Sequence, residues 1–131
     1  MNIAFLLTPK ADVAYIYDDF TLRQVLEKME HRGYTAIPII DREGQYIGTL
    51  TEGDLLWYIK NEHLLNLYDA EQELVTAVPR HHDNSALPIS TDIQDIFDLA
   101  LNQNFVPVVD DRGIFIGIIT RKNILQHCCH I

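Results

Sequence analysis

Two stretches of sequence decide the fold: Ile37-Pro38-Ile39-Ile40-Asp41 and, 69 positions later, Val106-Pro107-Val108-Val109-Asp110. Each is a short apolar run with a central proline, and each ends on the aspartate of an Asp-x-x-Gly turn. The register continues without a gap, because Gly44, Ile47, Gly48 and Thr51 correspond to Gly113, Ile116, Gly117 and Thr120. A repeat in register indicates two similar structural units within one chain.

The sequence around the first stretch predicts a helix, a hairpin and a second helix. Apolar residues recur with the period of a helix between Thr21, which can cap its start, and Gly33, which can end it. The apolar runs 36–40 and 46–50, joined by the turn, predict a β-hairpin. A further helix is expected from Thr51 through Lys60.

The second half repeats this order, with a helix at 92–101, strands at 105–109 and 114–119, and a helix from Thr120. Short strands are expected before the first helix of each half, at 13–17 and 87–89. The resulting order, β-α-β-β-α twice, is an α+β arrangement.

We divide the chain into a first repeat at 1–62, a linker at 63–85 and a second repeat at 86–131. The linker is expected to contain a short helix near 69–75. Because about 60 residues bury too little surface to be comfortable alone, the repeats should share a core in one compact module.

The composition narrows the function classes. Of 131 residues, 47% are hydrophobic and 22% charged, which is typical of a globular chain with a packed interior. The formal net charge of −9 disfavours binding to nucleic acid or to an anionic membrane surface, because polyanions need a basic face. No apolar run approaches the roughly 20 residues that span a bilayer. The apolar run 3–7 is too short for the core of a signal peptide, so we expect a cytoplasmic protein. The cysteines, Cys128 and Cys129, offer no disulfide framework.

The candidate site residues lie where a helix follows the second strand of each hairpin. Thr51-Glu52-Gly53-Asp54 and Thr120-Arg121-Lys122-Asn123 each begin such a helix. A helix N-terminus attracts phosphate, and a carboxylate three residues after the threonine can accept both hydroxyls of a ribose. The same Thr-x-x-Asp spacing is also close to a capping box, which has a structural role only.

These repeats resemble the CBS (cystathionine β-synthase-type) domain, and the resemblance covers roughly residues 7–127. It implies a tandem pair, or Bateman module, of the stand-alone bacterial type, with two pseudo-symmetric β-α-β-β-α repeats packed through their sheets. It further implies a regulatory signalling protein that is not an enzyme. Such a protein has no catalytic residues, no resident metal and no catalytic cofactor. Such a protein binds an adenine nucleotide (AMP, ADP or ATP) in clefts between the repeats.

Carried over by position, the resemblance implies two ligand-binding clefts, each built from both halves. One cleft would combine Lys10, Asp12, Ala14, Tyr34, Thr35 and Ala36 with Ile118, Thr120 and Asn123. The other would combine Val78, Pro79, Arg80, Asn104, Phe105 and Val106 with Thr49, Thr51 and Asp54.

The sequence departs from the family at Asn123, where the ribose-binding aspartate is usual. Asparagine should hold a ribose less firmly than a carboxylate does. The adjacent Arg121 and Lys122 suit a ligand with more phosphate charge. A second interpretation stays open, a cyclic di-AMP-binding signalling protein. The opening Pro9-Lys10-x-x-Val13-Ala14, with residues 33–38 and Thr120-Arg121, is similar to small stand-alone CBS-pair proteins of Gram-positive bacteria that bind cyclic di-AMP, and Asn123 fits this interpretation.

Two further interpretations come from other classes. In a ligand-free interaction scaffold, both threonine motifs would only cap helices. In a hydrolase or metal enzyme, the sequence His127-Cys128-Cys129-His130 would contribute ligands, although adjacent residues rarely chelate one ion. The family resemblance also implies a homodimer joined through the helices that bear Leu26, Met29, Phe97 and the run 55–59, and an unidentified regulated protein as partner.

Overall fold

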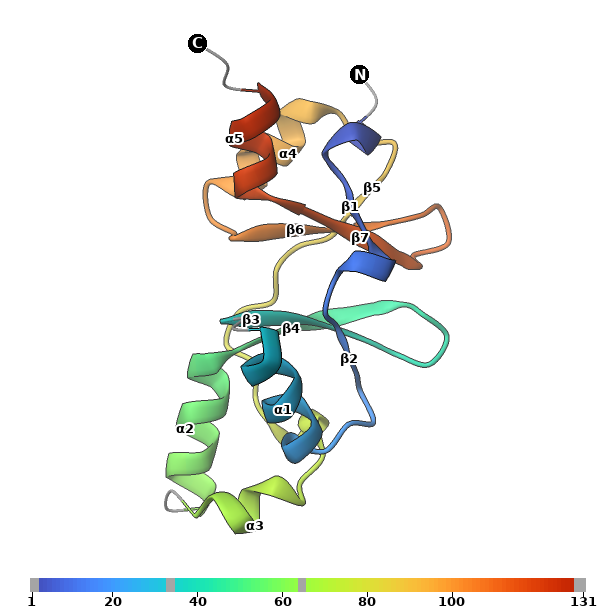
Figure 1. The fold of residues 1–131 in the computed structure, drawn as a ribbon. Coiled ribbons are helices and arrows are strands. Elements are labelled where there is room, and N and C mark those ends of the chain that lie inside the picture. The colour runs from blue at the N-terminus through green and yellow to red at the C-terminus, as the bar shows by residue number, and fades with distance from the viewer. Residues whose placement is uncertain (1–2, 33–34, 64–65, 129–131) are drawn as a thin grey trace. The chain divides into compact units, whose positions relative to one another are not determined.

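The computed structural model describes residues 3–32, 35–63 and 66–128 and divides the chain into two compact units. Unit 1 contains residues 1–13, 43–46 and 84–131. Unit 2 contains residues 14–42 and 47–83. Both units combine a small sheet with helices, which confirms the α+β class (Figure 1).

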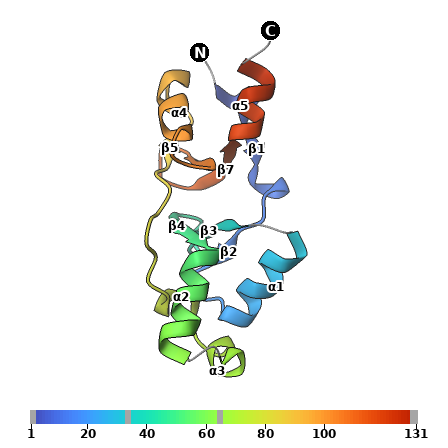
Figure 2. The same cartoon turned by 90° about the vertical axis from the view of Figure 1, so that its left-hand side faces the viewer.

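Unit 2 is built on a sheet of three strands in the order β2-β3-β4, with bounds Ile16–Tyr17, Ala36–Ile40 and Tyr46–Thr51. The pair β2 and β3 is parallel, with Ile16 opposite Ile39. Two helices, α1 (Leu22–Arg32) and α2 (Glu52–His63), lie on the same face of this sheet (Figures 1 and 2). The short helix α3 (Leu67–Glu71) and a 3₁₀ helix (Val75–Ala77) follow.

The core of unit 2 lies between this sheet and its helices. Helix α1 buries Leu22, Val25 and Met29, the face that its 3.6-residue period predicts. Its start is a capping box, because the Thr21 N–H donates to Gln24 Oε1 at 2.8 Å and the Gln24 N–H donates to Thr21 Oγ1 at 3.4 Å. The cap predicted at Thr21 is therefore confirmed, while Gly33 lies outside the described residues.

Unit 1 is built on a sheet of four strands in the order β1-β7-β6-β5, with bounds Thr8–Pro9, Phe115–Thr120, Phe105–Val109 and Leu87–Pro88. Helices α4 (Ile93–Ala100) and α5 (Arg121–Cys128) cover one face (Figures 1 and 2). Two 3₁₀ helices, Ile3–Leu6 and Lys10–Asp12, flank β1. The core of unit 1 combines residues from the N-terminal segment with residues of the second repeat. Ile3 and Leu6 are fully buried in it, and the other buried members are Ile96, Val106, Val108, Ile119 and Ile124.

The turn motif of the repeat has a visible structural role in unit 1. Asp110 Oδ1 accepts hydrogen bonds from the N–H groups of Arg112 at 2.8 Å and Ile114 at 3.0 Å, which closes the turn between β6 and β7. Gly113 adopts a φ of 82°, a conformation that glycine takes without a Cβ penalty. The hairpins predicted from the Asp-x-x-Gly spacing are therefore confirmed.

Each unit also receives the segment that precedes the other repeat. Strand β1 belongs to unit 1 because it pairs antiparallel with β7, with Thr8 opposite Ile118 and Pro9 opposite Gly117. Likewise Val75 and Val78 are buried in the core of unit 2. Sequence patterning predicted neither strand β1 nor its pairing. It also merged α3 and the 3₁₀ helix into one helix near 69–75.

We expect Gly117→Ala to lower the free energy of unfolding by about 2–3 kcal/mol, because an added Cβ would lie 2.2 Å from the carbonyl oxygen of Thr8. Urea unfolding followed by circular dichroism measures this change. Gly53→Ala is the matched control. Its Cβ would meet no atom closer than 3.7 Å, so this helical position should be neutral or gain about 0.5 kcal/mol. A wild-type midpoint for Gly117→Ala would contradict the β1–β7 contact.

Candidate functional site

In unit 2 the candidate site is the N-terminus of α2, directly after β4. The Asp54 N–H donates to Thr51 Oγ1 at 3.1 Å, and the Thr51 N–H donates to Asp54 Oδ2 at 3.1 Å. These reciprocal hydrogen bonds form a capping box with aspartate in the place of the usual glutamate. The threonine and the aspartate are therefore engaged in capping the helix, one of the two roles that their spacing predicts.

The other oxygen of this carboxylate is also occupied. Asp54 Oδ1 accepts a hydrogen bond from the backbone N–H of His81 at 3.1 Å. The Nδ1 atom of the same histidine lies 2.6 Å from Asp54 Oδ1. The Asp54 side chain is only 2% exposed, while the His81 side chain is 66% exposed. The imidazole thus covers a buried carboxylate.

The electrostatics of Asp54 follow from these contacts. Burial opposes ionisation of the carboxyl, but the hydrogen bonds from the His81 side chain and from the backbone of Thr51 and His81 outweigh it. The pKa of Asp54 therefore lies below its ordinary value. Asp54 is a carboxylate at neutral pH.

The segment that carries His81 is fixed along β4 by a second acidic residue. Asp83 Oδ1 accepts from the Thr49 N–H at 2.9 Å and from Arg80 Nε at 2.8 Å. Gly48 permits this close approach, because a Cβ there would lie 2.5 Å from Asp83 Oδ1. The Arg80 guanidinium is thereby directed to Asp83.

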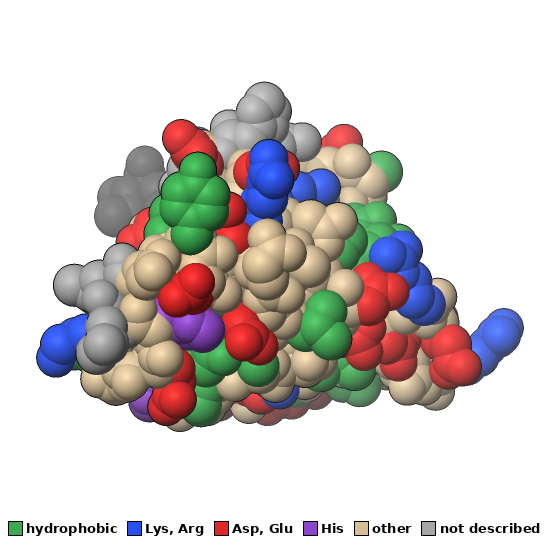
Figure 3. Space-filling view, turned by 90° about the horizontal axis from the view of Figure 1, so that it is seen from below, with side chains coloured by type: hydrophobic (Ala, Val, Ile, Leu, Met, Phe, Trp, Pro, Cys, Tyr) green, Lys and Arg blue, Asp and Glu red, His purple; other side chains and the backbone are tan. Residues whose placement is uncertain are grey.

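A small pocket of about 90 Å³ adjoins Asp54 on the same face of α2. It is lined by Asp54, Trp57, Tyr58, Asn61, Glu62, Pro79 and His81. The end of unit 2 that carries α3 is rich in acidic side chains (Figure 3), among which Glu62 and Asp69 are exposed. A polyanion would be repelled there.

In unit 1 the corresponding helix N-terminus is that of α5, directly after β7. The Asn123 N–H donates to Thr120 Oγ1 at 3.1 Å, the same first bond as in unit 2. The Asn123 amide Nδ2 donates to the Leu6 carbonyl oxygen and to Thr8 Oγ1, both at 3.2 Å. Asparagine therefore ties the N-terminal segment to α5, a role that the two donor hydrogens of its amide permit and a carboxylate could not fill.

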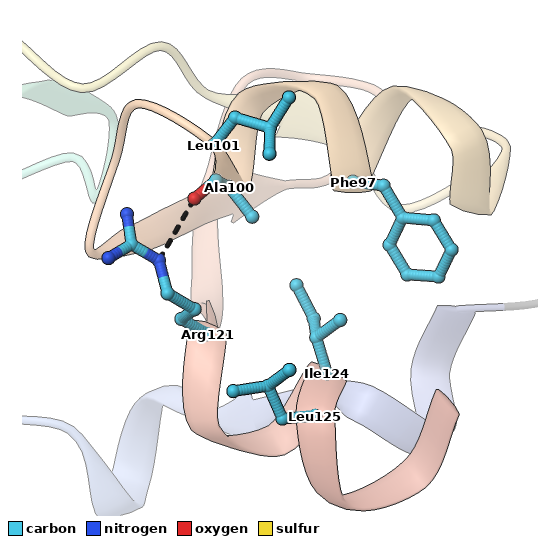
Figure 4. A pocket seen from close by; sticks show the side chains of 6 residues that line it. All are labelled: Phe97, Ala100, Leu101, Arg121, Ile124 and Leu125. Atoms are coloured by element: carbon cyan, nitrogen blue, oxygen red, sulfur yellow. Dashed lines mark hydrogen bonds between the residues drawn. The ribbon is translucent and has the colours of Figure 1, made fainter. Parts of the chain in front are cut away.

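Arg121 points away from this helix start. Its Nε donates to the Ala100 carbonyl oxygen at 3.0 Å, and its Nη2 donates to the Gln103 carbonyl oxygen at 3.0 Å. These bonds satisfy the carbonyl group of the last residue of α4 and that of Gln103 in the loop after it. The side chain also lines a pocket of about 420 Å³ between α4 and α5, together with Phe97, Ala100, Leu101, Ile124 and Leu125 (Figure 4).

The residues predicted to bind a ligand are divided between the units. Those in unit 2 are Ala14, Thr35, Ala36, Thr49, Thr51, Asp54, Val78, Pro79 and Arg80. Those in unit 1 are Lys10, Asp12, Asn104, Phe105, Val106, Ile118, Thr120, Arg121 and Asn123. Tyr34 lies outside the described residues. The two-sided clefts stay a prediction.

Sequence reasoning did not predict two contacts at the site. The linker histidines His81 and His82 are interpreted from the sequence as polar loop residues, with contact to a phosphate beside Arg80 as the alternative. Neither interpretation gives His81 its contact with Asp54. Thr8 precedes the predicted Lys10 and was not considered. The signal that could have found both is position, because each lies within two residues of a segment already assigned to a cleft.

The described residues contain no cluster of three or more His, Cys, Asp and Glu side chains that could hold a metal ion. Cys129 and His130 lie outside them. In the same parts of the chain, no helix has the length and apolar character needed to cross a membrane.

Asp54→Asn should destabilise the protein by about 1–3 kcal/mol at pH 7, because it weakens buried hydrogen bonds. A carboxyl whose pKa is lower in the folded state stabilises the fold above its unfolded pKa of about 3.9. That contribution is lost as the pH falls through the pKa of Asp54 in the folded state. Because asparagine carries no titrating carboxyl, Asp54→Asn should lose less stability than wild type between pH 7 and pH 3. Urea midpoints at the two pH values measure this.

The exposed Asp111→Asn is the control for this comparison and should follow wild type at both pH values. Equal losses of stability in Asp54→Asn and wild type would contradict the contacts assigned to Asp54.

Comparison with known proteins agrees with the repeat and with the fold. The sequence profile of the CBS domain matches residues 6–61 and 75–129. The chain is 29% identical over 119 residues to cyclic di-AMP receptor B of Bacillus subtilis, spanning 87% of this chain and 77% of that protein.

Two solved structures have the same fold. A structure of CbpB in complex with c-di-AMP superimposes with a TM-score of 0.84 at 26% identity, covering 96% of this chain and 83% of the other. A structure of CBSX2 in complex with AMP superimposes with a TM-score of 0.75 at 25% identity, covering 95% of this chain and 93% of the other. The two profile matches fall on the two repeats of this sequence, so the chain belongs to the CBS domain family and carries two copies of the domain.

Proposed function

We propose that this protein is a regulatory module that binds an adenine nucleotide, with cyclic di-AMP as the preferred ligand, and that a partner protein responds to the bound state. In this proposal the chain performs no catalysis and needs no catalytic cofactor. The nucleotide shifts the protein between two states that the partner distinguishes.

The observation that carries the choice of ligand is that neither candidate helix start presents an accessible carboxylate at the third position after its threonine. In unit 1 the position is Asn123, whose amide is bound to Leu6 and Thr8. In unit 2 Asp54 is 2% exposed and covered by His81. A mononucleotide offers a ribose with two free hydroxyls, which a carboxylate recognises best. In cyclic di-AMP the 3′ oxygen of each ribose is esterified, so this recognition is not required.

The relatives support the same choice. The similarity to cyclic di-AMP receptor B extends over 87% of this chain, and CbpB has the same fold with c-di-AMP bound. AMP is the second candidate, because CBSX2 binds it and because Asp54 retains the residue type that the family uses for a ribose.

Phosphate recognition is assigned to the helix starts. The Thr120 hydroxyl lies at the N-terminus of α5, where the positive end of the helix dipole favours an anion. Lys10 contributes a cationic side chain from the 3₁₀ helix that packs against β7. Both belong to unit 1, where asparagine replaces the ribose carboxylate.

We further propose that the protein forms a homodimer through the faces of its helices. A groove of about 500 Å³ on unit 2 is lined mainly by apolar side chains of α1 and α2, including Leu26, Met29, Leu55, Leu56 and Ile59. Leu56 is 54% exposed, and Leu101 and Leu125 are exposed beside the α4–α5 pocket (Figure 4). Apolar faces of this kind are covered in oligomers.

Calorimetric titration tests the ligand. Wild-type protein should bind cyclic di-AMP, and Thr120→Ala should weaken the affinity by about tenfold or more, because a hydrogen bond to a charged phosphate contributes about 1.5–3 kcal/mol. Thr76→Ala, an exposed threonine of the linker, is the control and should bind as wild type does. The absence of binding by any adenine nucleotide would favour the ligand-free scaffold.

Sedimentation velocity tests the dimer. Leu56→Asp should shift the wild-type dimer toward monomer, because it places a charge in the apolar groove. Leu74→Asp changes a leucine that is 49% exposed outside this groove and should leave the dimer intact. A wild-type monomer at micromolar concentration would contradict the proposed interface.

A further inference from the structure

We propose that His81 determines nucleotide selectivity by acting as an internal occupant of the ribose-binding carboxylate, which keeps nucleotides with a free ribose diol out of the Asp54 site. This inference rests on the proposed function and specifies what one of its two sites rejects. Without His81, the Asp54 site would accept mononucleotides.

The first argument is the number of acceptor positions that Asp54 has left. A carboxylate offers about four lone-pair positions. The Thr51 N–H, the His81 N–H and the His81 imidazole take three of them. A ribose diol needs two positions at once, so it cannot bind Asp54 unless one of these donors leaves.

The second argument identifies the donor that can leave. The Thr51 N–H belongs to the capping box of α2, and the His81 N–H belongs to a backbone segment fixed by Asp83. The His81 imidazole is held to the carboxylate by one contact of 2.6 Å and is otherwise 66% exposed. It can rotate into solvent without any change in the backbone.

The third argument is that the imidazole and a ribose compete for the same buried group. The Asp54 side chain is 2% exposed, so a ligand reaches it only where a covering side chain moves. A nucleotide with a diol must therefore break a short histidine–carboxylate contact before it forms its own hydrogen bonds. That requirement lowers its affinity, whereas a ligand without a free diol loses nothing when the contact remains.

The test compares AMP with its 2′,3′-dideoxy analogue on wild type, His81→Ala and His82→Ala. His82→Ala is the matched control, because His82 is the adjacent exposed histidine and Asp54 accepts from His81. We expect His81→Ala to bind AMP about tenfold more tightly than wild type, the size of a lost charge-assisted hydrogen bond. Binding of the dideoxy analogue and of cyclic di-AMP should change less than twofold.

The outcomes separate the two proposals. If cyclic di-AMP binds wild type but AMP binds His81→Ala no better than wild type, the selectivity role is overturned and the proposed function stands. If no adenine nucleotide binds wild type or the variants, both the selectivity role of His81 and the proposed function are overturned. Weaker AMP binding by His81→Ala would show that the histidine contacts the ligand, and would also overturn its role as an excluding group.

A measurement on the unaltered protein guards against misfolding of the variant. Imidazole ¹⁵N resonances are followed by NMR during titration with excess AMP. We expect the His81 Nδ1 signal to move toward that of a solvent-exposed histidine as the amide signals of Thr51 and Asp54 shift. Movement of those amide signals with a stationary His81 signal would overturn the proposal.

Discussion

The pairing of β1 with β7 is the constraint on which much of this structure depends. Two residues, Thr8 and Pro9, complete the edge of the sheet of unit 1, and they lie more than a hundred positions from their partners. The pairing brings Leu6 into the core and Thr8 to Asn123. It also requires glycine at position 117, where backbone of the N-terminal segment passes closest. One short strand thus completes the sheet edge, brings Leu6 into the core and places Thr8 beside the site residue Asn123.

The repeat explains why so much of the fold could be predicted. Helix period, the Asp-x-x-Gly turns and the apolar runs are local signals, and Gly113 and Asp110 act within a few residues of each other. Strand β1 could not be predicted in the same way. It contains only two residues, one of them a proline, and its stability comes from a partner strand that is distant in sequence.

In the candidate site too, the contacts between residues close in sequence could be predicted, and those between distant residues could not. The spacing from Thr51 to Asp54 predicted a helix start with a carboxylate, and the hydrogen bonds of α2 agree with it. The contact with His81 spans 27 positions and depends on how Asp83 fixes the linker against Thr49. Such a contact follows from tertiary packing, and the sequence indicates only that His81 lies next to a segment assigned to a cleft. The role of Asn123 as a donor to Leu6 was hidden for the same reason.

The exchange of segments between the units has a consequence for dividing the chain into fragments. Val75 and Val78 enter the core of unit 2, while Leu6 and strand β1 enter unit 1, so each unit contains residues that precede the other repeat. A fragment of residues 1–62 would therefore lack two core residues of unit 2. A fragment of residues 86–131 would lack an edge strand of its sheet and the core residues Ile3 and Leu6. The two repeats are distinct in sequence, but cutting the linker between them would leave both units incomplete.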